Sequence, residues 1–353
     1  MTNKDAKAFL EALNELEKEK GIAKESLLQA VEQALLTAYK KNYGDEENVE
    51  VIIDRENGDV KVYEVKTVVE EEDLYDAALE ISLEEARKIS RKAKLGEEIR
   101  IEVDCESFRR NAIQNGKQII IQKVREAERE NIYDRFKAQE GEILTGIIRR
   151  IDERKNVFIE FGGIETILTA GEQCISDRYK VGNRIKVYLV EVEKTNKFPK
   201  IVISRRHEGL LRKLFELEIP EISSGVIEIK AVAREAGSRA KVAVYSELAN
   251  IDIVGACIGQ KRSRIKNIVD ELGGEKIDIV IWKENMEEFV SAVLSPAKVN
   301  SVELLEDGET ARVLVDESQL SLAIGKSGQN ARLAAKLTGM RVDIKVANSE
   351  LED

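Results

Sequence analysis

The sequence IGKSGQNA at residues 324–331 has a near copy, IGQKRSRI, at residues 258–265. In both stretches a glycine follows an isoleucine, and basic residues come within the next few positions. Two further pairs of segments resemble each other around these stretches: GEKIDI at 274–279 with GMRVDI at 339–344, and AKVAV at 240–244 with ARVLV at 311–315. The two stretches start 66 positions apart, which is the size of a domain. The repeat therefore predicts two tandem α/β modules rather than a solenoid.

Each copy has the same predicted order of elements: a helix, two strands, a short helix, the glycine turn, a second helix and a last strand. Pro220 and Pro296 stand at matching points of the two copies, each after a predicted helix and before the next strands. The glycine turn therefore joins two helices in both modules.

The glycines of this turn let the backbone of a ligand come close to the chain. The helix that follows offers free N–H groups and the positive end of its dipole, which suit a phosphate. Basic residues surround both turns, so the phosphates of a single strand of nucleic acid are the natural ligand. The candidate RNA-binding residues are Gly259, Lys261, Arg262, Arg264 and Lys266 in the first copy and Gly325, Lys326, Ser327, Gly328 and Arg332 in the second.

Two other interpretations of the turns compete with nucleic-acid binding. A single copy could be an ordinary helix pair with solvated charge, but the presence of two basic copies favours nucleic acid. Gly325-Lys326-Ser327 also resembles the end of a nucleotide-binding P-loop. That motif needs a glycine five residues earlier, where this chain has Leu320, and a strand before the loop, which is missing here. An NTPase is therefore disfavoured.

The middle segment, residues 136–205, consists of short predicted strands separated by turn residues, a pattern typical of a small closed barrel of the OB type. The predicted strands lie at 142–151, 157–161, 165–168, 184–192 and 200–204. This segment carries 13 basic and 10 acidic side chains, a net charge of +3, whereas residues 1–135 carry 23 and 32, a net charge of −9.

Alternation along two of these strands predicts a basic outer face on the barrel. Phe158 points outward because its neighbours Val157 and Ile159 face inward. The outward set on the fourth strand is Arg184, Lys186 and Tyr188. Cations meet phosphates and an exposed ring stacks on a base, so these four residues are candidates for binding single-stranded nucleic acid. The alternative is a half-buried phenylalanine beside solvated cations, which is common on sheets with one wet face.

The first 135 residues predict an α+β domain. The expected elements are helices at 4–20 and 24–43, strands at 49–53 and 60–65, a short helix after Ser82, a strand at 99–103 and a long helix at 107–137. Two local signals are the strongest. Asn57-Gly58 between the first two strands is typical of a hairpin turn, and Ser82 with Glu85 fits a capping box.

Composition excludes several classes of protein. The chain has 353 residues, a net charge of −11 and a single histidine, His207, which we interpret as structural. Metal clusters and nucleophilic relays commonly use histidine side chains, and this chain has only one. We therefore expect no catalytic site, no metal and no cofactor. No apolar run approaches the ~18 residues of a membrane span, and the N-terminus lacks a signal peptide. The cysteines, Cys105, Cys174 and Cys257, form no CxxC pair and fit reduced thiols, so we expect a cytoplasmic protein without a membrane partner.

These features together resemble the NusA family of bacterial transcription factors, in which an α/β N-terminal domain precedes an S1-type OB barrel and two tandem type II KH domains. Short segments along essentially the whole chain carry the resemblance: FRR at 108–110, KQ at 117–118, QKVREAER at 122–129, ACIG at 256–259, GEKIDIVIW at 274–282 and SPA at 295–297. The domains implied are the N-terminal domain at 1–135, the S1 barrel at 136–205, the first KH domain at 206–282 and the second at 283–348.

The resemblance implies an RNA-binding elongation factor that is not an enzyme. In this family the N-terminal domain docks on bacterial RNA polymerase near the RNA exit channel, at the flap of the β subunit. The barrel and the KH pair hold the nascent single-stranded RNA, and the factor modulates pausing, intrinsic termination and antitermination with other Nus factors. The sequence shows no oligomerisation signature, so we expect a monomer.

The first turn departs from the Gly-x-x-Gly motif of KH domains, because Arg262 stands where the motif has its second glycine. A side chain there narrows the approach of a ligand backbone, whereas its charge attracts phosphates. Whether this turn clamps RNA stays open at this point.

Two other functions also stay open. The chain could be the S1/KH subunit of an RNA-degradation complex, which would need clustered carboxylates for a metal. The acidic runs at 45–47 and 70–73 are turn-like and are interpreted as solvated. A ribosome-associated protein is the other alternative, but a net charge of −11 argues against it.

Overall fold

The computed structural model describes residues 10–347 except residues 12, 16, 19–22, 44–47, 57, 104–105 and 249, and it describes only the backbone at 41–43 and 106–117. The chain divides into two compact units, Met1–Ile132 and Tyr133–Asp353. Parts of the predicted first helix, Asn57 of the predicted hairpin turn and Cys105 fall outside the described residues.

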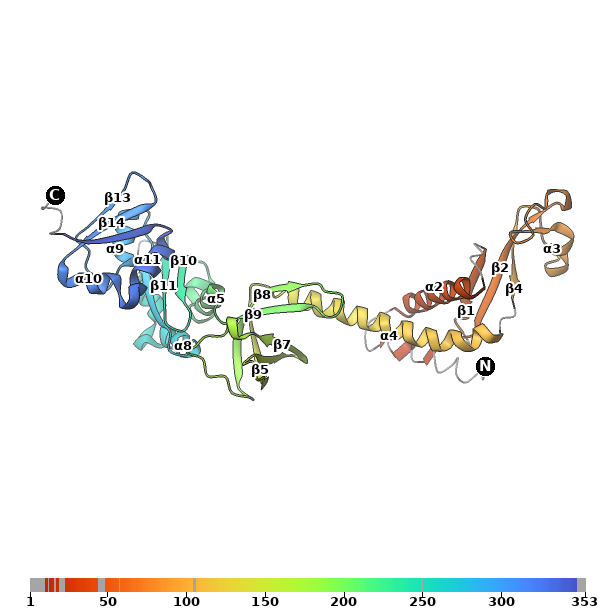
Figure 1. Cartoon of the computed structure of the whole chain (residues 1–353), viewed down its shortest axis with the longest axis horizontal. Coiled ribbons are helices and arrows are strands. Elements are labelled where there is room, and N and C mark those ends of the chain that lie inside the picture. The colour runs from red at the N-terminus through yellow and green to blue at the C-terminus, as the bar shows by residue number, and fades with distance from the viewer. Residues whose placement is uncertain are drawn as a thin grey trace. The chain divides into compact units, whose positions relative to one another are not determined.

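The first unit combines a small mixed sheet with helices (Figure 1). Its described elements are α2 (Lys24–Tyr43), β1 (Val49–Ile53), β2 (Val60–Val69), the 3-10 turn η1 (Glu71–Asp73), β3 (Glu80–Ser82), α3 (Leu83–Ile89), β4 (Glu98–Glu102) and α4 (Glu106–Lys137). β2 is the organising strand, because β1 and β4 pair with it antiparallel and β3 pairs with it parallel. The predicted hairpin and long helix are thus confirmed.

Helix α2 is held by one apolar face. Leu28 and Leu35 are fully buried in a core that includes Val51 and Ile53 of β1. This burial, rather than the intrinsic helix propensity of the segment, stabilises α2 on the sheet.

The capping box before α3 is present, since Ser82 Oγ accepts a hydrogen bond of 3.3 Å from the backbone N–H of Glu85. The strand β3 next to it was not predicted. Three residues are too few to show a period of two, and their pairing partner lies more than ten positions away in the sequence.

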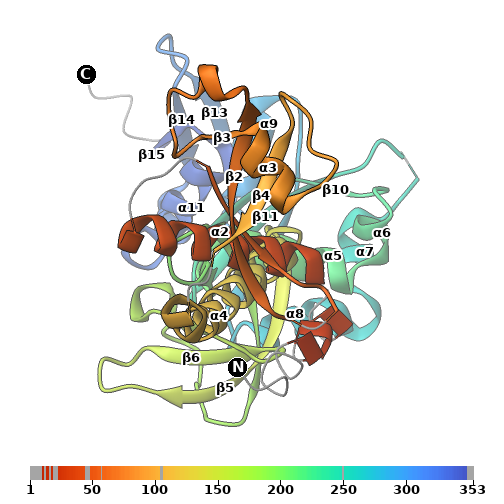
Figure 2. The ribbon, with the colours of Figure 1, turned by 90° about the vertical axis from the view of Figure 1, so that its right-hand side faces the viewer.

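The second unit begins with a five-stranded barrel. Its strands are β5 (Ile143–Ile151), β6 (Val157–Phe161), β7 (Ile164–Leu168), β8 (Arg184–Glu193) and β9 (Lys200–Ser204). They pair in the order β7-β6-β5-β8-β9, and β7 also approaches β9, so the sheet nearly closes. Figure 2 shows β5 and β6 as neighbouring strands. The inward residues predicted from alternation, Val157 and Ile159 among them, are buried as expected.

Two modules of the same order follow the barrel and confirm the repeat. The first has α5 (Glu208–Glu218), α6 (Pro220–Ser223), β10 (Glu228–Glu235), β11 (Arg239–Tyr245), α7 (Ile253–Ile258), α8 (Ser263–Glu271) and β12 (Lys276–Ile281). The second has α9 (Met286–Val293), β13 (Ser301–Leu304), β14 (Thr310–Val315), α10 (Glu317–Ile324), α11 (Gln329–Thr338) and β15 (Arg341–Val346). In each sheet the middle strand pairs antiparallel with the strand before it and parallel with the last one.

Pro220 marks a difference between the copies. We expected it to lead directly to a strand, but it begins the short helix α6, where a fixed φ and a missing N–H suit the first turn of a helix.

The two modules share one hydrophobic core. Ala233, Ala243 and Val280 of the first module are buried together with Phe289 and Leu333 of the second. Hydrogen bonds between polar side chains of the two modules cross the same boundary and add to this packing. The two glycine turns are therefore held within one rigid assembly.

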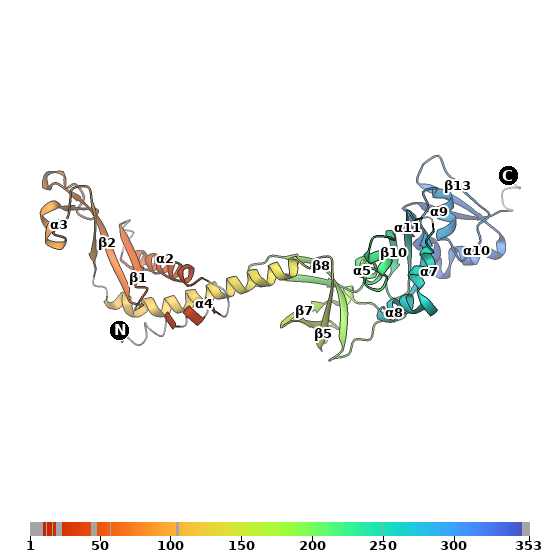
Figure 3. The same cartoon turned by 180° about the vertical axis from the view of Figure 1, so that it is seen from behind.

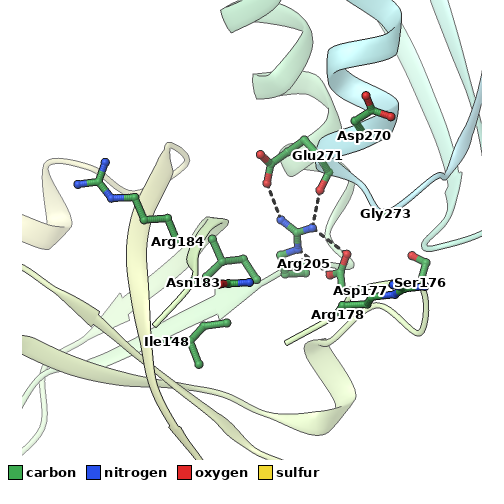
Figure 4. A pocket seen from close by; sticks show the side chains of 11 residues that line it. Ile148, Ser176, Asp177, Arg178, Asn183, Arg184, Arg205, Asp270, Glu271 and Gly273 are labelled. Carbon is green, nitrogen blue, oxygen red and sulfur yellow. Dashed lines mark hydrogen bonds and ion pairs between the residues drawn. The ribbon is translucent and has the colours of Figure 1, made fainter. Parts of the chain in front are cut away.

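The barrel is joined to the first module by the buried guanidinium of Arg205, whose side chain is 3% exposed. Its Nε and Nη2 each donate to Asp177 at 2.8 Å, and Nη1 donates to Glu271 Oε1 at 3.0 Å (Figure 4). Nη1 also donates to the carbonyl oxygen of Lys186 at 2.7 Å, and Nη2 to that of Glu271 at 2.8 Å. One side chain thus binds groups from both sides of the junction.

A second buried pair lies nearby. Arg234 on β10 donates from Nε and Nη2 to the two oxygens of Glu275, at 2.8 and 2.9 Å, and neither side chain is more than 2% exposed. Glu275 also accepts a hydrogen bond of 2.8 Å from the N–H of Gly237, and Arg234 Nη1 donates to the carbonyl of His207 at 2.8 Å. Both charges are therefore compensated inside the protein.

Replacing Glu275 by alanine is expected to lower the free energy of unfolding by about 3–5 kcal/mol, because it leaves the Arg234 guanidinium buried without a counter-charge. Urea unfolding followed by the fluorescence of Trp282, the single tryptophan, measures the effect. Glu287→Ala, at an exposed position of α9, is the control. Equal unfolding midpoints for the two variants would contradict the role given to the buried pair.

Candidate nucleic-acid interface

The two glycine turns follow the same backbone path. Helix α7 ends at Gly259, with φ 73° and ψ 171°, and α10 ends at Gly325, with φ 75° and ψ 172°. The third residue of each turn, Lys261 or Ser327, has φ of 52°. Figure 3 shows the helices α7, α8 and α10 that flank the turns. The repeat found in the sequence is therefore a repeat in conformation.

Arg262 occupies the backbone position that Gly328 takes in the second copy. Its φ and ψ are 63° and 24°, and those of Gly328 are 75° and 14°. This left-handed conformation costs about 1–2 kcal/mol for a residue with a Cβ. The first turn therefore keeps the conformation of the motif and adds a cation at a strained position.

A polar side chain fills the space under the first glycine of each turn. A Cβ on Gly259 would lie 2.7 Å from Cγ of Arg264, and a Cβ on Gly325 would lie 2.8 Å from Cβ of Asn330. Arg264 Nη1 donates to the carbonyl of Ala256 at 2.6 Å. The first glycine is required in both turns because no side chain fits above these residues.

Asn330 has the same role in the second turn, where its Nδ2 donates to the carbonyls of Leu322 at 3.3 Å and Ala323 at 3.2 Å.

Arg264 also forms an ion pair of 2.7 Å with Glu221. We predicted Arg264 as an RNA contact. Its guanidinium binds the end of α7 and the short helix α6 and so holds the turn in place, and its contact with RNA stays a prediction.

The exposed cations at the turns are Lys261, Arg262 and Lys266 in the first copy and Lys326 and Arg332 in the second, and all of them except Arg332 are unpaired within the described part of the chain. Arg332 is different: Nε donates to Glu235 Oε1 at 3.0 Å and Nη1 donates to the carbonyl of Ser327. The hydrogen bond from Arg332 lowers the pKa of Glu235 below its ordinary value. Arg332 thus links the second turn to the first module.

The predicted stacking ring on the barrel is covered. Phe158 lies on the outer side of β6, but its side chain is 9% exposed because the Arg150 guanidinium sits 3.3 Å from the ring centroid. The exposed phenylalanine expected at this position is therefore wrong. A base can reach the ring only if Arg150 moves.

Two of the three outward residues of β8 contact residues at the boundary with the first module and are only partly exposed. The Tyr188 ring stacks on His207 with centroids 4.7 Å apart, and Lys186 Nζ lies 3.7 Å from Glu271. The exposed face predicted for these two residues is therefore only partly present: the Tyr188 ring is covered, whereas the Lys186 side chain is 33% exposed, and alternation cannot show that another module covers part of the strand. Arg184 is exposed and lines a cavity of about 480 Å³ beside Arg205 (Figure 4).

Family models match four consecutive parts of the chain: NusA N-terminal domain at residues 8–130, S1 RNA binding domain at 137–206, NusA-like first KH domain at 205–282 and NusA-like second KH domain at 286–352. A transcription termination/antitermination protein NusA from Halalkalibacterium halodurans is 50% identical over 345 residues, which cover 98% of this chain and 89% of the relative. The chain belongs to the NusA family.

Two further NusA proteins show the same extent of similarity. The protein of Bacillus subtilis is 50% identical over 337 residues, covering 96% of this chain and 90% of the relative. The protein of Thermus thermophilus is 44% identical over 355 residues, covering 98% and 91%. The predicted family, with its S1 barrel and two KH domains, is confirmed, and the interpretation as a transcription factor is favoured over an RNA-degradation or ribosomal subunit.

Both cysteines in the described part of this NusA-family chain, which are its potential nucleophilic thiols, are buried. No group of three His, Cys, Asp or Glu side chains within the described part could hold a metal ion. Burial raises the pKa of the Cys257 thiol to about 11, and burial also raises the pKa of Cys174, so both thiols stay protonated at neutral pH. No helix in the described ranges is both long and apolar enough to cross a bilayer.

His207 lies at the junction between the S1 barrel and the first KH domain. Its Nδ1 accepts a hydrogen bond of 3.0 Å from the N–H of Gly209 and so caps α5, while its ring packs on Tyr188. These contacts agree with the structural role expected for this histidine.

Sequence reasoning missed the residues that hold the NusA surfaces in place, among them Asn330 and the pair Arg234–Glu275. One signal was available for Asn330. It stands at the position of Arg264 in the aligned copies, and a polar residue at the same point of both turns suggests a shared local role. The buried pair has no such signal, because its partners lie 41 positions apart.

Arg262→Gly is expected to raise the free energy of unfolding by up to about 1 kcal/mol, because it removes the left-handed strain while adding some chain entropy. Urea unfolding with Trp282 fluorescence measures this change. The same variant is expected to reduce the slope of log K against log salt for RNA binding by about 0.7, the value for one phosphate contact on a single strand.

Lys266→Gln is the matched control, since it removes an exposed cation from the same segment without changing the turn. It should reduce the salt slope without stabilising the protein. A destabilised Arg262→Gly variant would contradict the strain assigned to this position.

Proposed function

We propose that this NusA-family chain docks on bacterial RNA polymerase through residues 1–135, at the flap of the β subunit near the RNA exit channel. Its S1 barrel and KH domains then hold the nascent single-stranded RNA. The chain modulates pausing, intrinsic termination and, with other Nus factors, antitermination. It acts in the cytoplasm as a monomer and without catalysis.

The observation that carries this proposal is the pair of matching turns within one assembly. Gly259 and Gly325 have the same dihedral angles, and exposed cations stand beside both. A shared core and the contact of Arg332 with Glu235 keep the turns at a constant separation. Two phosphate-binding turns at a constant separation suit one continuous strand of RNA, whose phosphates recur regularly.

The turns differ in how they can bind. The first has three exposed cations and a side chain at Arg262, so it attracts phosphates mainly by charge. The second has Gly328, where a ligand backbone can come close to the chain, and two exposed cations, of which Arg332 is paired with Glu235 and Lys326 is not paired. Each contact alone is weak. Tethering to polymerase raises the effective concentration of RNA, so modest affinities suffice.

The first unit supports a protein partner rather than RNA. Residues 1–135 have a net charge of −9, which repels phosphates. Around its small second core, several apolar side chains are exposed, including Tyr75 at 88%, Ile89 at 52% and Leu95 at 47%. Apolar side chains among acidic ones suit a docking surface for another protein.

Single-round transcription by core bacterial RNA polymerase tests the proposal on a template with a hairpin pause and an intrinsic terminator. The full chain is compared with the fragment 133–353, which corresponds to a compact unit with its own cores. The full chain is expected to lengthen pauses or shift termination, and the fragment is expected to have neither effect. If both bind RNA and neither alters transcription, the proposed function is wrong.

Gly328→Asp is expected to weaken RNA binding at least tenfold, since it places a Cβ and a negative charge where the phosphate approaches. Fluorescence anisotropy with a labelled, unstructured RNA measures the dissociation constant. Gly339→Asp is a matched control, because Gly339 also has a left-handed backbone, with φ 72°, and lies in the same module beyond the turn. Equal affinities for the two variants would remove the turn from the RNA site.

A further inference from the structure

Phe198 is the exposed phenylalanine of the barrel. Its side chain is 64% exposed, whereas Phe158 is 9% exposed and Phe161 6%. The other phenylalanines with described side chains, all in the second unit, are Phe136, Phe215 and Phe289, each at 2% or less. A ring left in water forgoes the free energy of burial, and its π-face is free to stack on a ligand.

The ring stands on an ordered loop. Phe198 lies between β8 and β9, and Thr195 Oγ1 donates to its carbonyl at 2.7 Å while accepting from the N–H of Lys197 at 3.2 Å. Pro199 follows and restricts Phe198 to extended backbone conformations. Binding to this ring therefore costs little further ordering of the chain.

The charge of the loop identifies the kind of partner. Residues 194–200, KTNKFPK, contain three lysines and no acidic side chain. Lys200 pairs with Glu193 at 2.9 Å, and Lys194 lies over the ring of Tyr133, so the lysines are ordered beside the hairpin. An exposed ring in a segment with three cations and no acidic side chain matches a base flanked by phosphates better than an apolar protein surface.

The place of the loop agrees with this chemistry. It joins the fourth and fifth strands of the barrel, and in OB folds this loop borders the face that binds oligonucleotides. Arg150 covers the ring of Phe158, for which the sequence predicted stacking on a base. Phe198 is instead the phenylalanine of the barrel whose ring is exposed.

We infer that Phe198 stacks on a base of single-stranded RNA and that the lysines of residues 194–200 bind the neighbouring phosphates. This inference rests on the proposed function, since it adds a contact on the barrel to those of the KH turns. It also assigns the barrel's stacking contact to a hairpin loop rather than to a strand.

Fluorescence anisotropy with the full chain and a labelled, unstructured single-stranded RNA tests the inference. Phe198→Ala is expected to raise the dissociation constant by about fivefold or more. Phe198→Leu keeps apolar area without a π-face, so it should weaken binding nearly as much. Phe198→Trp should bind as tightly as the unchanged chain, and its added fluorescence should be quenched by the RNA.

Val181→Ala is the matched control, because Val181 is another exposed apolar residue of the barrel, at 63%. If Phe198→Ala and Val181→Ala bind RNA equally, the inference is wrong. It is also wrong if Phe198→Ala binds RNA normally but loses its effect on transcription, since the ring would then contact a protein. Measuring Gly328→Asp alongside separates the two proposals. If Gly328→Asp weakens RNA binding and Phe198→Ala does not, the proposed RNA site at the second KH turn stands and only the stacking contact of Phe198 is wrong.

Discussion

The buried guanidinium of Arg205 sets the geometry on which the S1 barrel and the KH domains depend. It binds the carboxylate of Asp177 with one edge and Glu271 with the other; Arg205 and Asp177 are buried, and Glu271 is 26% exposed. A planar group with donors in fixed directions allows only one orientation of its partners, which the flexible ammonium of a lysine would not. The pair of Arg234 and Glu275 adds a second constraint nearby. The exposed cations of the first turn therefore hold a constant position relative to the barrel.

The turns show how a backbone conformation survives a change of residue. Arg262 and Gly328 share a left-handed conformation although only one of them is suited to it. Under the first glycine, Arg264 and Asn330 differ in size and charge but bind equivalent carbonyls of the preceding helix. The conformation is thus determined by hydrogen bonds within each turn, which leaves the outward side chains of the two copies able to differ.

Much of this organisation could be predicted from the sequence, because it depends on periodicity and on repetition. The tandem modules, the barrel strands and the long helix α4 all follow from patterns over neighbouring residues. What covers a residue could not be predicted. Alternation placed Phe158 and Tyr188 on the outer face correctly, but Arg150 covers one ring and the first KH module covers the other. The structural role of Arg264 could not be predicted for the same reason, since its partner Glu221 is distant in sequence.

The core shared by the two KH domains has a consequence for how the protein folds. Without the second domain, Ala233, Ala243 and Val280 of the first would lose the apolar side chains that cover them, Phe289 and Leu333 among these. The first domain has a further core of its own, which includes Leu214 and Leu272, but each domain is expected to be less stable alone than in the pair. A substitution that destabilises one KH domain is therefore expected to destabilise the turn of the other domain as well. The two copies look like independent modules in the sequence, but the stability of each one depends on the presence of the other.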